Sequence, residues 1–254
     1  MDRYAYQSDL RYKNAMEKLC YSLISIVICI GFRSIACGIC MLIVNSFIIV
    51  YLGKTPFRTY FHALTLPVAF VVISTVTIIL NFSKTPLDAF AIAVGGIYIT
   101  ASYQGIAFAI KLFITAISSV SALYVLNFTT PMTDIISACR KIHVPELFTE
   151  LMLLIYRFIF VLNVTANSIM TAQKSRLGNK TFGISCQSFG QMGSALFIKA
   201  MKRSSALYDA MEARCYDGTI RVLEEEHKPQ KMEIILISAP ELLFVTVSIV
   251  DRIF

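Results

Sequence analysis

The sequence contains no tryptophan and few charged residues among its 254 positions. Charged side chains make up 15% of the chain, whereas soluble domains carry about a quarter. Hydrophobic residues reach 56% and the mean hydropathy is +0.67. These values exclude an ordinary soluble domain and favour an integral membrane protein, in which phenylalanine and tyrosine can serve as interfacial anchors.

Histidine is scarce as well, and residues that could carry chemistry are not grouped. His62, His143 and His227 lie far apart and form no metal-ligand spacing. The chain has no glycine-rich phosphate loop, no HExxH motif, no nucleophile elbow and no recognisable Ser or Cys triad. The sequence therefore predicts no catalytic residue, no metal site and no cofactor held by this chain.

Neither the cysteines nor the positive charge indicates another class of protein. The seven cysteines are odd in number, which argues against a disulfide framework. Cys37 and Cys40 could form a redox or zinc pair, but they stand in an apolar run without a second pair, which favours simple packing. The net charge of +7 is not concentrated in a basic run with exposed aromatics, so no nucleic-acid partner is expected.

Apolar runs predict about five transmembrane helices, because some 20 apolar residues are needed to cross a bilayer. The expected spans are 19–32 and 34–52, which form a tight hairpin, followed by 62–81, 104–126 and 233–250. The stretch 87–103 is interrupted by Gly95 and Gly96 and fits a re-entrant or interfacial segment better than a sixth span.

Positive charge sets the expected sidedness. Residues 132–231 hold 13 of the 23 Lys and Arg residues, and such regions remain in the cytoplasm. An odd number of spans with a cytoplasmic N-terminus agrees with this, and no cleavable signal is recognisable. We therefore predict an all-α membrane protein with four spans in 1–129, a cytoplasmic domain of long helices in 130–231, and a final span in 232–254.

The predicted cytoplasmic domain has strong helix signals. Thr130 and Pro131 begin one helix, Pro145 begins a second that runs to Leu177 and is stopped by Gly178, and a third is stopped by Gly218. Small residues recur at helical spacing, which favours either close helix packing or plain helix propensity. They are Ser168 and Ala172 on one helix, and Ala206 and Ala210 on the other.

Both long helices finish with an arginine shortly before a glycine, in "TAQKSRLG" (171–178) and "AMEARCYDG" (210–218). A cation at a helix C-terminus interacts favourably with the helix dipole, by about 0.3–1 kcal/mol, and this explains either arginine alone. The same pattern at two helix ends can also serve as a pair of contact sites for a partner.

The runs "VPELFTELMLLIYRFIFVL…TAQKSRLG" and "MGSALFIKAMKRSSALYDAMEARCYDG" resemble the T component of energy-coupling factor (ECF) transporters, in its cobalt-type CbiQ family. The likeness is strong over about 130–220 and covers the flanking spans by arrangement. It implies a multi-pass protein of a prokaryotic cytoplasmic membrane. Its cytoplasmic domain would couple a dimer of ABC-type ATPases, which bind ATP, to a membrane subunit that binds cobalt.

The family's two Ala-Arg-Gly signatures would fall on Ser175, Arg176 and Leu177 and on Ala213, Arg214 and Cys215. Each departs from the family pattern, since the glycine comes later, at Gly178 and Gly218. Nickel uptake is the nearest alternative. A self-contained secondary transporter is disfavoured because no internal repeat is present, and an intramembrane enzyme because no paired titratable groups occur within the spans.

Overall fold

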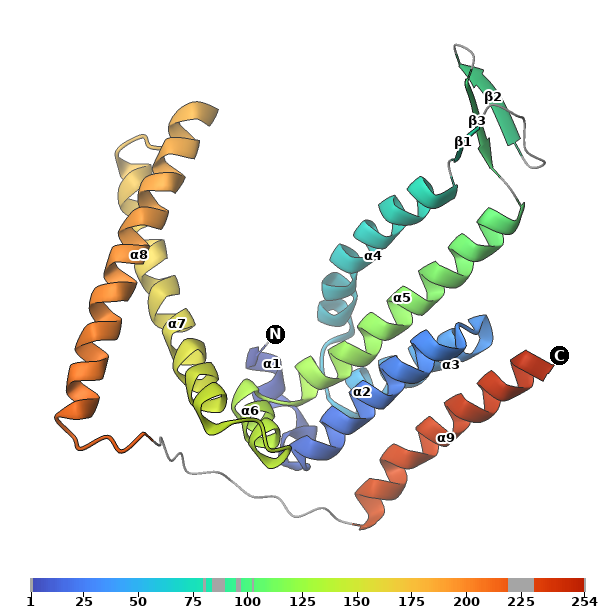
Figure 1. Ribbon diagram of the computed structural model, residues 1–254, viewed down its shortest axis with the longest axis horizontal. Helices are drawn as coiled ribbons and strands as arrows, with labels where there is room; N and C mark the ends of the chain where they lie inside the picture. The colour runs from blue at the N-terminus through green and yellow to red at the C-terminus, as the bar shows by residue number, and fades with distance from the viewer. Residues whose placement is uncertain are drawn as a thin grey trace. The chain divides into compact units, whose positions relative to one another are not determined.

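The computed structural model describes residues 2–79, 81–83, 90–94, 97–101, 103–218 and 231–253. The chain divides into two compact units (Figure 1). The first comprises Met1–Ile135 together with Glu225–Phe254, and the second comprises Ile136–Glu224. This division by packing runs close to the predicted domain borders at 130 and 231. Apart from connecting turns and one small sheet, the described residues are helical, in agreement with the predicted helical membrane protein.

The first unit is a helix bundle built around α5 (Tyr103–Thr129). α5 packs against each of the three long helices that precede it, and α9 packs against the first two of these. Two short N-terminal helices complete the unit. The bounds are α1 (Asp2–Gln7), η1 (Asp9–Tyr12), α2 (Ala15–Phe32), α3 (Ile35–Phe47) with its π-helical continuation η2 (Ile48–Leu52), α4 (Phe57–Ile79) and α9 (Lys231–Ile253).

The first four predicted spans are confirmed as helices long and apolar enough to cross a membrane. The first begins at Ala15, four residues earlier than expected, because Asn14 accepts a hydrogen bond from the Met16 amide and caps the helix there. The tight connection to the next span is also present. Arg33 ends α2 in the left-handed conformation, and Ser34 caps α3 by accepting from the Cys37 amide.

A fifth helix also passes the length and hydropathy criteria for a span. It is α7 (Glu146–Ser175), which the sequence analysis placed in the cytoplasmic domain. The measure rests on length and composition only, and α7 belongs to the second unit, where it packs against α8 (Phe182–Glu212). Several of its large apolar side chains are exposed, among them Leu147, Phe148 and Ile155. The last predicted span corresponds to α9, which continues through Pro240.

The segment 87–103 is not a sixth span. Its described parts form two antiparallel strands, β2 (Phe90–Val94) and β3 (Ile97–Ala101), a form that the sequence analysis did not consider. β1 (Asn81–Ser83) pairs with the other edge of β3, which gives the strand order β1-β3-β2. Isoleucine, valine, tyrosine and phenylalanine on either side of two glycines are a hairpin pattern, and strands of five residues are too short to cross a bilayer.

Hydrogen bonds between helices join the bundle at several positions. Tyr21 Oη donates to Asn45 Oδ1 at 2.7 Å, and Tyr124 Oη donates to the Ala63 carbonyl at 2.9 Å. Lys18 is buried, and its ammonium donates to the carbonyls of Leu10 and Thr129. In lipid, where burial of apolar surface does little to bring helices together, such bonds and close packing are what join them.

α3 and α5 approach each other closely at Gly38. A Cβ atom at Gly38 would lie 2.6 Å from Ile114 Cγ2 and 3.1 Å from Ser118 Oγ. Ser118 Oγ donates to the Gly38 carbonyl at 2.8 Å, which joins the two backbones at the same point. Only glycine allows this contact, as at other crossings of small residues in membranes.

We expect Gly38→Val to separate α3 from α5 and to destabilise the bundle by about 1–3 kcal/mol, the usual result of overpacking. The measurement is the temperature at which half of the detergent-solubilised protein is still monodisperse after heating. Gly31→Val is the control, because a Cβ atom there meets nothing within 4 Å. Equal losses from both variants would show that the crossing at Gly38 is not special.

Candidate functional site

The predicted site lies on an antiparallel hairpin of two long helices, α7 with 30 residues and α8 with 31 (Figure 1). Pro145 precedes α7, and Thr181 caps α8 by accepting from the Ile184 amide. A helix rises 1.5 Å per residue, so each spans ~45 Å. Because the helices are antiparallel, their C-terminal ends, which carry the two arginines, lie at opposite ends of the hairpin.

The two helices end in the same turn. After α7, Leu177 takes a left-handed conformation (φ 58°), and the Gly178 amide donates to the Gln173 carbonyl at 2.8 Å. After α8, Cys215 takes the same conformation (φ 58°), and the Tyr216 amide donates to the Met211 carbonyl at 3.1 Å. A bond spanning five residues around one left-handed residue is the Schellman ending of a helix.

Arg176 and Arg214 hold the same position in these two turns. Each directly precedes the left-handed residue, and each amide donates to the carbonyl three residues earlier, Gln173 in one case and Met211 in the other. Both arginines are exposed, as are Ser175 and Ala213 before them. We call these two turns the arginine tips, Ser175–Gly178 and Ala213–Tyr216. Neither guanidinium is enclosed by the hairpin.

The helix-stopping role predicted for Gly178 and Gly218 is wrong. The left-handed residue that ends each helix is Leu177 or Cys215, the third residue of each proposed signature. That is the position where the family's pattern has glycine, the residue that takes a left-handed conformation at least cost. Gly218 has a positive φ of its own (93°), but it lies three residues beyond the turn.

Gly178 is needed for close packing against α8. A Cβ atom there would lie 2.9 Å from both the Gln173 carbonyl oxygen and Ser188 Oγ. Ser188 Oγ donates to the Gly178 carbonyl at 2.9 Å, and Gln173 Nε2 donates to the Ser188 carbonyl at 2.8 Å. The first arginine tip is therefore tied to α8 by side-chain hydrogen bonds.

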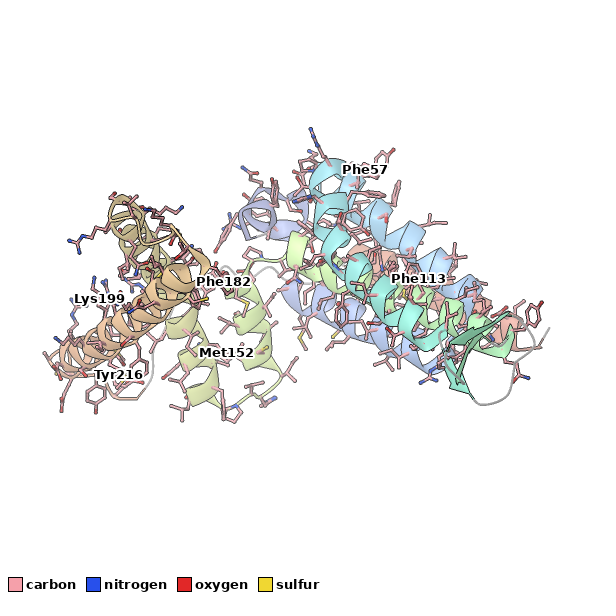
Figure 2. The ribbon with its side chains drawn as sticks, turned by 90° about the horizontal axis from the view of Figure 1, so that it is seen from above. Phe57, Phe113, Met152, Phe182, Lys199 and Tyr216 are labelled. Carbon is pink, nitrogen blue, oxygen red and sulfur yellow. The ribbon has the colours of Figure 1, made fainter. Side chains whose placement is uncertain are left out.

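The second arginine tip is tied to α7 in a comparable way. Tyr216 Oη donates to Glu150 Oε2 at 2.9 Å, and Glu150 is only 3% exposed. Figure 2 shows Phe182, at the start of α8, and Tyr216, just beyond its end, at opposite ends of that helix. The hydrogen bond to Glu150 raises the pKa of the Tyr216 phenol, so the phenol remains protonated and able to donate well above neutral pH.

The small residues that were predicted to pack the two helices together are not buried between them. Ser168, Ala172, Ala206 and Ala210 are all exposed, and the Ser168 hydroxyl donates within its own helix to the Val164 carbonyl. The hydrogen bonds between α7 and α8 come instead from Gln173, Ser188 and Tyr216. The predicted packing role of the four residues finds no support within this hairpin.

Sequence reasoning missed Glu150, Ser188, Gln173 and Tyr216. Their pairs are separated by 10 to 66 positions, and no periodic pattern connects them. The only available signal was Glu150, which with Glu146 is one of two acidic residues in the first turns of a largely apolar helix. Elsewhere, the residues that the structure describes include no group of three or more His, Cys, Asp or Glu arranged to hold a metal ion. Cys37 and Cys40 are free thiols in α3.

We expect Cys215→Gly to stabilise the second turn by about 1 kcal/mol, because glycine escapes the cost that other residues meet in a left-handed conformation. Cys186→Gly, at an exposed position inside α8, should have the opposite sign, because glycine is a poor helix former. Hydrogen exchange of residues 211–216 and 182–190, followed by mass spectrometry, measures both. Faster exchange at 211–216 in Cys215→Gly would contradict the assigned turn.

Comparison with known proteins agrees with these features. The family model of CbiQ, described as a cobalt transport protein, matches residues 8–226. The cobalt transport protein CbiQ of Salmonella typhimurium is 26% identical over 86% of this chain and 97% of its own length. A putative fused cobalt transport protein CbiMQ of Methanocorpusculum labreanum is 31% identical over 89% of this chain, which spans 38% of that longer protein.

The transmembrane protein EcfT of an energy-coupling factor transporter from Ruminiclostridium cellulolyticum is 32% identical over 48% of this chain and 50% of its own length. The chain therefore belongs to the CbiQ family of cobalt transport proteins.

Proposed function

We propose that this chain is the T component of an energy-coupling factor importer for cobalt. In this role it transmits motion from two cytoplasmic ABC-type ATPases to a membrane subunit that binds the ion. The chain itself holds neither ATP nor metal, and it is not an enzyme. Family membership supports cobalt transport, and the energy-coupling factor relative supports the type of transporter.

The observation that carries the proposal is the repeated arginine tip. Two exposed arginines stand in the same turn at the ends of two helices. A guanidinium is planar, is always charged and presents five donors, so it can bind carboxylates and backbone carbonyls in a groove of another protein. Helix C-terminal dipoles explain one cation at one helix end, but they do not require the same left-handed turn twice.

The separation of the tips fits two docking partners. They lie at opposite ends of a hairpin whose helices are ~45 Å long, which is too far apart for one groove on a small domain. Two copies of an ATPase, or two related ATPases, each accept one tip in this arrangement. When nucleotide binding changes the distance between the ATPases, a hairpin attached to both must tilt or bend, and that movement is the proposed output.

The apolar surface of the hairpin supports a membrane partner. Large apolar side chains remain exposed on both helices, more than an isolated soluble hairpin would carry. They include Phe148, Ile155, Ile159, Phe160 and Val164 on α7, and Phe189, Phe197, Ile198 and Met201 on α8. We assign this surface to the substrate-binding subunit and the adjoining lipid. The basic composition of residues 132–231 supports a cytoplasmic location for the hairpin, and an even number of preceding spans would put the N-terminus on the same side.

Cobalt is favoured over nickel because the matching family and two of the relatives are named for cobalt transport. A nickel importer would use the same coupling geometry, since the ion is selected by the other membrane subunit. Uptake of radioactive cobalt and nickel by cells that express the complete transporter distinguishes the two.

The coupling role predicts that Arg176→Ala and Arg214→Ala each reduce the amount of ATPase that co-purifies with the chain in mild detergent, by about tenfold or more if each arginine is a hot spot. The double variant should abolish cobalt uptake. The fold of the chain should survive, because both side chains are exposed and the turns are held by backbone hydrogen bonds.

Arg203→Ala is the matched control, because it removes an exposed arginine from the interior of α8. It should leave ATPase recovery and uptake at the wild-type level. Normal ATPase recovery and uptake in the double variant would overturn the proposed function. If Arg203→Ala lowered ATPase recovery and uptake equally, the losses would be due to the removal of positive charge in general and not to the arginine tips.

A further inference from the structure

The α7–α8 hairpin has almost no apolar interior. Both helices are described throughout, and only three of their residues are buried: Thr149, Glu150 and Ser188. All three are polar, although the helices contain many phenylalanines, leucines and isoleucines. Two antiparallel helices in water are usually held by an apolar seam between them. This pair needs another means of fixing one helix against the other.

The side-chain hydrogen bonds described above fix α7 against α8, and they occur at corresponding positions of the two arginine tips. In each arginine tip, the residue two places after the arginine is the one tied to the opposite helix. Gly178 accepts from Ser188 of α8, and Tyr216 donates to Glu150 of α7. The acceptor or donor on the opposite helix is one of the three buried residues in both cases. We call these two pairs the tip clasps.

We propose that the tip clasps, Ser188–Gly178 and Glu150–Tyr216, are positioning elements that hold the two arginines at a fixed separation. The inference rests on the proposed coupling function and extends it to Ser188 and Glu150, which lie outside the two tips. A hydrogen bond is directional and short-ranged, so a clasp fixes the tip more sharply than nonspecific apolar contact does. The hairpin then transmits displacement as one body.

Loss of a clasp should free a tip without unfolding the helices. The Schellman turn is closed by backbone bonds within each helix end, Gly178 to Gln173 and Tyr216 to Met211. These bonds remain when a side-chain hydroxyl is removed. The arginine then keeps its local turn and its affinity for a groove, but it moves relative to the opposite helix. A variant that lacks a clasp should therefore still bind the ATPases but transmit their movement poorly.

The separation of the tips can be measured on the complete chain alone, by pulsed electron paramagnetic resonance between a spin label on Cys215, in the second tip, and one on the cysteine introduced by Ser175→Cys, in the first tip. Positions 175 and 215 are both exposed. The replacements Cys20→Ser, Cys40→Ser, Cys139→Ser and Cys186→Ser remove the other accessible thiols, and Cys29 and Cys37 are buried. We expect a single narrow distance distribution for the native clasps, and loss of that narrow peak in Tyr216→Phe and in Ser188→Ala.

Matched variants separate the clasps from general effects. Tyr208→Phe and Ser194→Ala remove the same hydroxyl groups from exposed positions of α8 and should keep the narrow peak. Glu150→Gln retains an acceptor oxygen and should preserve it, whereas Glu150→Leu should lose it. A distribution that stays narrow in Tyr216→Phe and Glu150→Leu would overturn the inference, and so would equal broadening in the two control variants.

The functional arm uses the assembled transporter, with unlabelled protein. Ser188→Ala, which lies outside both tips, should recover the ATPases in wild-type amounts and still hydrolyse ATP, while the ratio of cobalt taken up to ATP hydrolysed falls severalfold. Full coupling in this variant would refute the positioning role. If Arg176→Ala and Arg214→Ala fail to reduce ATPase recovery, the docking proposal fails, and the distance measurement still decides whether the clasps hold the tips.

Discussion

A left-handed residue directly after an arginine ends both long helices, and the arrangement of the hairpin depends on this turn. The turn ends the helix at Leu177 and Cys215 with a left-handed residue and a bond that spans five residues, and it leaves the preceding arginine at the surface. The same local geometry occurs at two positions in the chain. Because the helices are antiparallel, two equivalent arginines are thereby presented at opposite ends of one structure.

The two units of the chain are stabilised by different means. In the membrane bundle, backbones approach closely at Gly38, and buried hydroxyl, amide and ammonium groups find partners on neighbouring helices. In the hairpin, polar clasps stand near the ends of the helices and the apolar side chains face outward. The bundle is suited to remain in the bilayer as an anchor. The hairpin, with exposed apolar faces and cationic ends, is suited to contact several partners at once.

The departures from the family's Ala-Arg-Gly pattern become clear from the backbone. Leucine and cysteine occupy the left-handed position in place of glycine, so the turn survives without it at some cost in local stability. Gly178, which had looked like the displaced helix stop, instead leaves room for α8, which lies too close for a side chain there. A glycine near a helix end can thus serve packing instead of conformation, and spacing alone does not distinguish the two.

The sequence by itself determined the membrane class, the first four spans and the long helices of residues 146–212. It also determined that each of these long helices finishes with an arginine. Each of these features follows from local composition or from a short motif. It did not reveal the strands at 90–101, where an apolar segment fits a span or a hairpin until its pairing is known. Only the tertiary structure decided that Leu177 and Cys215 carry the turn, that Ser168 and Ala206 are exposed, and that Glu150 meets Tyr216. The physical reason is that packing and hydrogen bonds join residues far apart along the chain, and no periodicity records which distant side chains will meet.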